Sequence, residues 1–145
     1  MAAFLSVYLV LRQIKILSAQ LEATQQASEA QSIISIVQFL QSNDARKARE
    51  TVRASLSKAH HDQWTEEQAR DASFACANYD VVAALLRAGL IKNKQIIIEN
   101  WAPSIQHCHQ VLAPYIEKKR MGLGGHPKYW SNFEWLRTQC SEEKT

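Results

Sequence analysis

The sequence contains few residues that interrupt helices, and stretches that favour strands are nearly absent. Its 145 residues include only four glycines and three prolines. Alanine, glutamine, leucine and isoleucine, which are frequent in helical proteins, are common instead. We therefore predict an all-α fold, and the length fits one domain of ordinary size.

Cysteine is scarce as well, and its distribution argues against a disulfide framework. The chain holds three cysteines, Cys76, Cys108 and Cys140. Their number is odd, they are widely spaced, and each falls where an apolar helix face is expected. We interpret them as reduced core residues of a protein in the cytosol.

No motif for catalysis or cofactor binding stands out. Residues 60–62 (His-His-Asp) and 107–109 (His-Cys-His) contain common zinc ligands. On a helix, however, adjacent side chains diverge by about 100°, whereas chelation needs spacings of three or four residues. Cys108 and His109 are unsuitable as nucleophile and base for the same reason, and the glycines of residues 122–125 lack the rest of a phosphate loop. We predict no enzymatic activity, metal, cofactor or small-molecule substrate.

The longest apolar run covers residues 2–11 and is followed directly by Arg12 and Lys15. As a helix it would rise about 15 Å, roughly half of a hydrocarbon core. No basic residue precedes it and no small-residue cleavage site follows, so we do not expect a cleaved signal peptide. Two interpretations remain open: the run ends a longer transmembrane helix whose start is lost, or it inserts partway.

Both interpretations predict that the N-terminal helix contacts membrane lipid. Because positive residues tend to remain inside, they also predict a bacterial inner-membrane protein whose helical domain faces the cytoplasm. The alternative is a soluble protein whose first helix packs into its own core or into a dimer.

Hydrophobic periodicity divides the chain into a long N-terminal helix and a bundle of about four helices. No glycine or proline interrupts residues 13–41, and the small, polar residues 22–32 indicate a solvated stalk with weak self-association. Expected helices then cover residues 45–60, 65–88, 93–116 and 129–140. Residues 42–44 and Asn93 are expected to cap the first and third of these, while Thr65 with Gln68 forms a capping box and Gly89 ends the second. The third passes through Pro103 and Pro114 and is either one kinked helix or a stack of short ones. The predicted divisions are residues 1–21 (membrane-proximal or partial transmembrane helix), 22–43 (stalk), 44–140 (bundle) and 141–145 (disordered tail).

The apolar stripes of these helices predict one core. It should contain Tyr79, Val82, Leu86, Ile97, Trp101, Ile105, Leu112 and Phe133.

Two groups of residues are candidates for binding a partner. Arg46, Arg49 and Arg53 share one face of the basic helix 45–60, which could contact phosphates, anionic lipid heads or the acidic residues 66–80. Trp130 and Trp135 are candidate exposed anchors. The net charge of +3 is too small to imply a nucleic-acid partner by itself.

Four segments carry a resemblance to a known family: residues 45–52, 79–91, 114–120 after the Trp101 helix, and 129–136. Together they resemble a bacterial family known only as a domain of unknown function, in which a transmembrane helix and a polar stalk precede a compact helical domain. The resemblance implies this topology and no activity. We expect a non-enzymatic, membrane-tethered interaction module that binds a protein partner, or itself through the long helix. The alternative is a soluble regulatory protein that uses helix 45–60 on nucleic acid.

Overall fold

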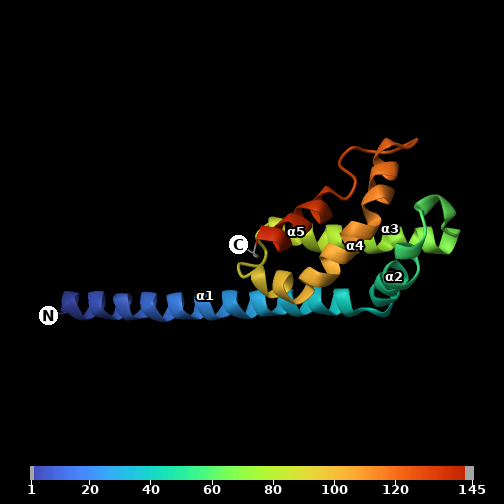
Figure 1. The fold of residues 1–145 in the computed structure, drawn as a ribbon. Coiled ribbons are helices and arrows are strands. Elements are labelled where there is room, and N and C mark those ends of the chain that lie inside the picture. Colours follow the sequence, from blue (N-terminus) through green and yellow to red (C-terminus); the bar gives the residue numbers. More distant parts are fainter. Residues whose placement is uncertain (1, 143–145) are drawn as a thin grey trace.

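The computed structural model describes the backbone of residues 2–142 and the side chains of residues 8–141, and every regular element there is helical. The elements are α1 (Ala2–Gln41), α2 (Asn43–Ala54), the 3-10 turns η1 (Leu56–Lys58) and η2 (His61–Gln63), α3 (Glu66–Arg87), α4 (Gln95–Met121) and α5 (Ser131–Glu142). Helices α2, α4 and α5 pack around α3, and α1 lies along one side of this bundle (Figure 1). The predicted all-α fold is confirmed.

The first helix is much longer than its contact with the bundle. It has 40 residues and, at about 1.5 Å per residue, is roughly 60 Å long. Only its last turns pack on the core, through Ile33, Ile36, Val37 and Leu40. Every side chain in residues 8–28 is exposed, and Figure 1 shows this part extending past the bundle.

The predicted inner-membrane placement, with the helical domain facing the cytoplasm, is wrong on this structure. Among residues 2–142, no helix combines the length and the apolar character that crossing a bilayer requires. The reason is the short apolar run, because Arg12 and Lys15 follow it and glutamines and Glu22 come soon after. The side chains of Phe4, Leu5 and Val7, which supported the prediction, lie outside the described ones.

Several helix ends are set, as predicted, by residues next to them in the sequence. The Ser42 hydroxyl accepts from the Ala45 N–H at the start of α2. Thr65 and Gln68 form the predicted capping box, with bonds of 3.2 Å and 2.9 Å. After α3, Gly89 adopts a φ of +73°, which a residue with a side chain rarely adopts.

Other ends differ from the prediction because tertiary contacts decide them. Helix α2 stops at Ala54 rather than near His60, and η1 then turns Leu56 into the core. Asn93 does not cap α4; its backbone N–H instead donates to Glu29 Oε1 of α1 at 3.0 Å. Helix α5 continues to Glu142, so the first residues of the predicted disordered tail are helical, and residues 143–145 lie outside the described chain.

Helix α4 passes through both of its prolines as one element. Pro103 and Pro114 lie inside it, and its path changes direction along its length (Figure 1). Each proline removes one backbone N–H from the helical ladder, which accounts for such bending.

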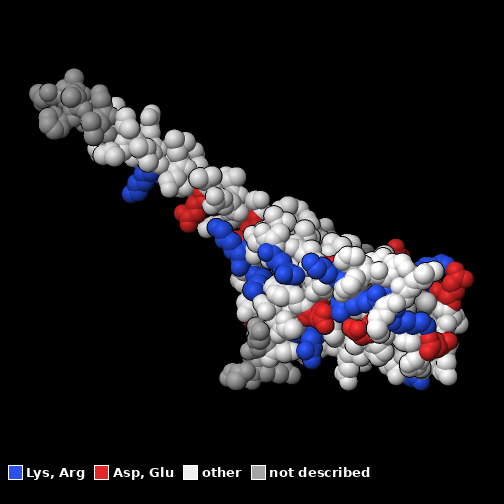
Figure 2. Space-filling model, turned by 90° about the horizontal axis from the view of Figure 1, so that it is seen from above, with Lys and Arg blue, Asp and Glu red and all other residues white. Residues whose placement is uncertain are grey.

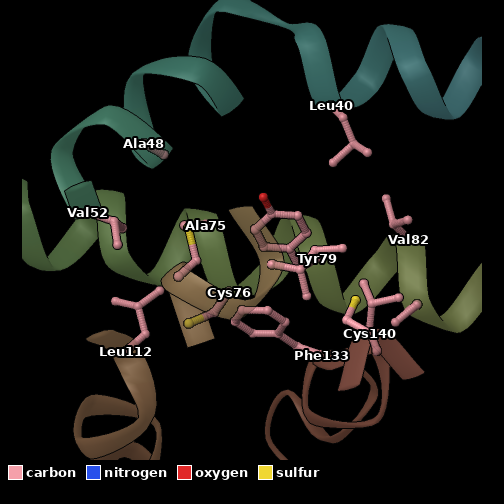
Figure 3. Close-up of a cluster of buried hydrophobic side chains, with 14 of the residues drawn as sticks. Leu40, Ala48, Val52, Ala75, Cys76, Tyr79, Val82, Leu112, Phe133 and Cys140 are labelled. Carbon is pink, nitrogen blue, oxygen red and sulfur yellow. The ribbon is translucent and has the colours of Figure 1, made fainter. Parts of the chain in front are cut away.

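The core forms where the five helices α1 to α5 meet (Figure 3). The ring of Tyr79 stacks on Phe133 with centroids 5.1 Å apart, and its hydroxyl donates to Ser104 Oγ at 2.8 Å. Of the predicted core, only Trp101 is half-buried, at the edge of the cluster; the others are buried. The three cysteines are buried, as predicted, and burial raises the pKa of Cys108 to about 11.

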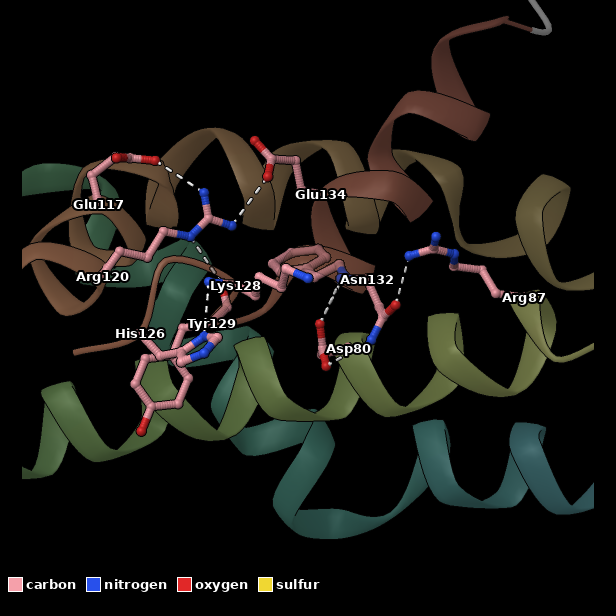
Figure 4. A network of polar contacts seen from close by, with 10 residues as sticks. Asp80, Arg87, Glu117, Arg120, His126, Lys128, Tyr129, Asn132 and Glu134 are labelled. Carbon is pink, nitrogen blue, oxygen red and sulfur yellow. Dashed lines mark hydrogen bonds and ion pairs between the residues drawn. The ribbon is translucent and has the colours of Figure 1, made fainter. Parts of the chain in front are cut away.

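Two polar networks fasten α5 and the loop before it (Figure 4). Asp80 of α3 accepts from the backbone N–H groups of Asn132 and Phe133 at 2.9 Å and 3.1 Å. Arg120, at the end of α4, pairs with Glu117 and Glu134 and donates to the Tyr129 carbonyl. The loop between α4 and α5 is thus tied at both ends.

Candidate functional site

The three predicted partner-binding arginines have three different environments. Arg46 is exposed. Arg49 is half-buried and donates from Nη2 to the Leu40 carbonyl at 2.6 Å. This carbonyl lies in the last turn of α1, where carbonyl groups have no hydrogen-bond partner within the helix. Arg53 is exposed and pairs with Glu50 on its own helix at 3.1 Å. They share one helix, but Arg49 is a structural contact of α1 rather than part of a free basic surface.

The acidic helix α3 does contact α2, through residues other than these arginines. Lys47 Nζ lies 3.0 Å from Glu67 Oε1, and this bond raises the pKa of Lys47 and lowers that of Glu67. Thr51 donates to Asp71 Oδ2 at 2.7 Å. The basic charge of α2 is therefore partly balanced within the fold.

Both candidate tryptophan anchors are half-buried packing residues. Trp130 stacks on Tyr115 at 6.1 Å between centroids, and its φ of 54° places it in the left-handed region directly before α5. Trp135 has two cations over its ring, Arg87 at 5.5 Å and Lys94 at 5.3 Å. Internal contacts therefore cover much of each ring.

Among the described residues, exposed large apolar side chains are most concentrated on the projecting part of α1. Large apolar side chains there are 48% to 63% exposed: Tyr8, Leu9, Val10, Leu11, Ile14, Ile16, Leu17 and Leu21. Figure 2 shows few charged side chains on this part of the helix. A helix with apolar residues on every side is normally buried against something, so this segment is the main candidate interaction surface.

Four of these side chains form a single line, which we call the α1 seam: Val10, Ile14, Leu17 and Leu21. Their spacings of four, three and four residues are those of a coiled-coil seam. At about 100° per residue, the centre of this line is about 120° around the axis from the residues that pack on the bundle. The bundle therefore leaves the α1 seam uncovered.

A second candidate site lies between the two 3-10 turns and α4. His60, His61 and Asp62 each offer a ligand atom, and these atoms lie within 4.8 Å of one another. They border a pocket of about 420 Å³ that His107, Trp64 and Tyr115 also line. Lys118 of α4 bonds to Asp62 and lowers the pKa of that carboxyl group. The divergence of adjacent side chains on a helix, expected for both histidine segments, holds for residues 107–109 but not for residues 60–62, which lie at a turn.

Half-buried His109 faces a different environment from His107. Its ring packs edge-on against Phe133 at 5.3 Å, and burial lowers its pKa. His107 and His109 thus point to different parts of the molecule, as expected for alternate positions on a helix.

Comparison with known proteins identifies the family without an activity. No curated protein and no solved structure matches the chain. A family described as a domain of unknown function, DUF4760, matches residues 1–140. The match covers α1 and the bundle together, almost the whole sequence, so the chain belongs to the DUF4760 family.

Proposed function

We propose that the protein is a non-enzymatic helical interaction module that pairs with a second copy of itself through the α1 seam. The observation that supports this function is the exposure of the seam. Its four side chains are 51% to 63% exposed on a helix that extends past the bundle.

The composition of the seam favours a second copy as the occupant. Ile14 and Leu17 take the a and d positions at the centre of the seam, a combination that favours parallel pairs of helices, and Val10 and Leu21 take the d and a positions on either side. The flanking residues are uncharged: Leu11, Gln13, Ser18 and Gln20. The charged residues of α1, Arg12, Lys15, Glu22 and Glu29, lie at least about 90° away around the axis. Two identical seams therefore meet without repulsion between like charges.

The length of the seam limits the strength of pairing. Beyond Leu21 the same line continues with Thr24 and Ser28, which contribute little apolar surface. Burying the exposed half of each seam side chain should contribute about 1 kcal/mol, or roughly 8 kcal/mol over both copies. Association itself costs at least about 4 kcal/mol. The net gain is at most about 4 kcal/mol, so we expect a weak, reversible dimer with a Kd of about 1 mM.

The nucleic-acid alternative has less support from the geometry. Arg49 is engaged with the end of α1, and Lys47 is paired with Glu67. A continuous basic stripe would require these side chains to face a phosphate backbone.

Sedimentation equilibrium of the full chain, from about 10 to 500 µM, tests the proposal. The wild-type protein should dimerise with rising concentration, and the double variant Ile14→Glu, Leu17→Glu should stay monomeric. The matched control Leu9→Glu, Ile16→Glu makes the same chemical change at exposed positions outside the seam and should still dimerise.

Circular dichroism should show the same bundle unfolding temperature for all three proteins, because residues 8–28 make no buried contact. A wild-type protein that is monomeric at every concentration contradicts the proposal. Equal loss of dimer in both double variants contradicts the seam.

A further inference from the structure

The break between α2 and α3 gathers three metal-ligating side chains from consecutive residues. His60 Nδ1 lies 3.1 Å from Asp62 Oδ2, and His61 Nδ1 lies 3.1 Å from Asp62 Oδ1. The imidazole rings of the two histidines have centroids 4.0 Å apart. This convergence is achieved because His60 is extended, with φ −65° and ψ 146°, and the 3-10 turn begins only at His61. The divergence of adjacent side chains on an α-helix does not apply here.

The separations match those of ligands around one zinc ion. Imidazole nitrogen and carboxylate oxygen bind zinc at about 2.0–2.2 Å, usually in a tetrahedron, whose ligand atoms are then about 3.3 Å apart. The distance of 3.1 Å between His60 Nδ1 and Asp62 Oδ2 is close to this value, and one ligand atom from each of the three residues lies within 4.8 Å of the other two. Two histidines and one carboxylate also form a common zinc ligand set that leaves one position open.

The alternative role for these residues, a set of ion pairs, leaves one polar atom unexplained. His61 Nδ1 is buried and makes no hydrogen bond, although Asp62 Oδ1 is 3.1 Å away. A buried polar atom without a partner is costly and indicates a missing ligand or a special role. A metal ion bound at Nδ1 would satisfy this atom.

The surrounding residues hold the histidines and the aspartate in place. The side chain of His61 is only 11% exposed and packs edge-on against Trp64 at 6.2 Å. Trp64 is itself fixed, because its Nε1–H donates to the Ala59 carbonyl at 3.0 Å and its ring packs on Tyr115 at 5.3 Å. Such support reduces the cost of ordering the ligands when an ion binds.

Lys118 is compatible with a bound ion. It bonds to Oδ1 of Asp62, which leaves Oδ2 and the remaining lone pairs of the carboxylate available. Ligating carboxylates in metal sites commonly accept such a second hydrogen bond, which orients them. The neighbouring pocket gives an ion access from solvent.

From this geometry we propose that His60, His61 and Asp62 form a binding site for one Zn²⁺ ion, whose open position faces the pocket beside His107. This site is independent of the α1 seam, which lies on another part of the molecule. A zinc site also differs from our sequence-based prediction of no bound metal.

The test is calorimetric titration of the metal-free full chain with Zn²⁺. We expect one ion per chain, and His60→Ala and Asp62→Asn should each weaken binding at least about tenfold. Both side chains are more than half exposed, so these variants should fold, which circular dichroism checks. His107→Ala is the matched control, because it removes a histidine of the same pocket that is not in the ligand group and should leave the affinity unchanged.

Titration with Co²⁺ as a spectroscopic probe identifies the ligands. Binding at the proposed site should give the visible absorption of a four- or five-coordinate ion without a thiolate charge-transfer band. Absence of binding at one ion per chain overturns the proposal. So does a thiolate band, which would assign the ion to cysteine, or a loss of affinity in His107→Ala equal to that of His60→Ala.

Discussion

Replacing Asp80 by alanine should remove a cap that reaches α5 from another helix. The Asp80 carboxylate accepts from the N–H groups of Asn132 and Phe133 at 2.9 Å and 3.1 Å, and from the Asn132 side chain at 3.3 Å. These N–H groups are among the first of α5, which have no partner within the helix. The residue before α5, Trp130, has no side-chain acceptor to replace them.

The magnitude follows from what the carboxylate contributes. Hydrogen bonds to a charged group contribute about 1.5–3 kcal/mol each, and loss of an N-cap costs about 0.5–2 kcal/mol. Since the two bonds share one acceptor and are not additive, we expect Asp80→Ala to lower the free energy of unfolding by about 2–3 kcal/mol. Asp80→Asn keeps an acceptor but loses the negative charge at the helix N-terminus, so it should cost about 1 kcal/mol.

Urea unfolding, followed by circular dichroism and tryptophan fluorescence, measures both variants. For a chain of this length, the alanine variant should also lower the Tm by about 5–10 °C. Glu99→Ala is the control, since it removes an exposed carboxylate of α4 and should change the stability by less than about 0.5 kcal/mol. A loss below about 0.5 kcal/mol in Asp80→Ala would refute the assigned cap.

Three further predictions concern other parts of the fold. Arg49→Ala should lower the free energy of unfolding by about 1.5–3 kcal/mol, because the Leu40 carbonyl loses its charged donor. Arg46→Ala should leave the free energy of unfolding nearly unchanged, and equal effects of the two variants in urea unfolding would contradict this prediction. The three buried cysteines should react with a thiol reagent only as fast as the protein unfolds, and rapid labelling of the native protein would exclude their burial. Burial lowers the pKa of His109, so the unfolded chain takes up a proton at this residue more readily than the folded protein. The free energy of unfolding should therefore be undiminished above about pH 6.5 and fall as the pH drops from 6.5 towards the folded-state pKa. His109→Gln should reduce that fall, and an unchanged pH profile in this variant would contradict the prediction.

Helix ends could be predicted from the sequence where the capping group belongs to the same segment. Thr65 with Gln68 and Gly89 are of this kind, and the structure has both. The start of α5 could not be predicted, because its acceptor, Asp80, lies 52 residues before Asn132. The early end of α2 also depends on packing, since it is the core that receives Leu56.

The candidate sites show the same division between local and tertiary information. The apolar character of α1 is visible in the sequence, but which side remains uncovered depends on the packing of Ile36 and Leu40. The arginine face could be derived from helical spacing, yet the engagement of Arg49 with Leu40 requires the angle between α1 and α2. The histidine cluster was dismissed because the helix was expected to continue to His60, where the chain in fact turns.

Disulfide cross-linking tests the central claim, pairing through the α1 seam, most directly. A cysteine introduced by Leu17→Cys would meet its counterpart in a parallel dimer, while one introduced by Ile16→Cys would lie outside the seam, and the buried native cysteines should not take part. Under mild oxidation at high protein concentration, we predict that Leu17→Cys gives a covalent dimer in high yield and Ile16→Cys gives little. Equal cross-linking of the two variants, or none in Leu17→Cys, would contradict the account.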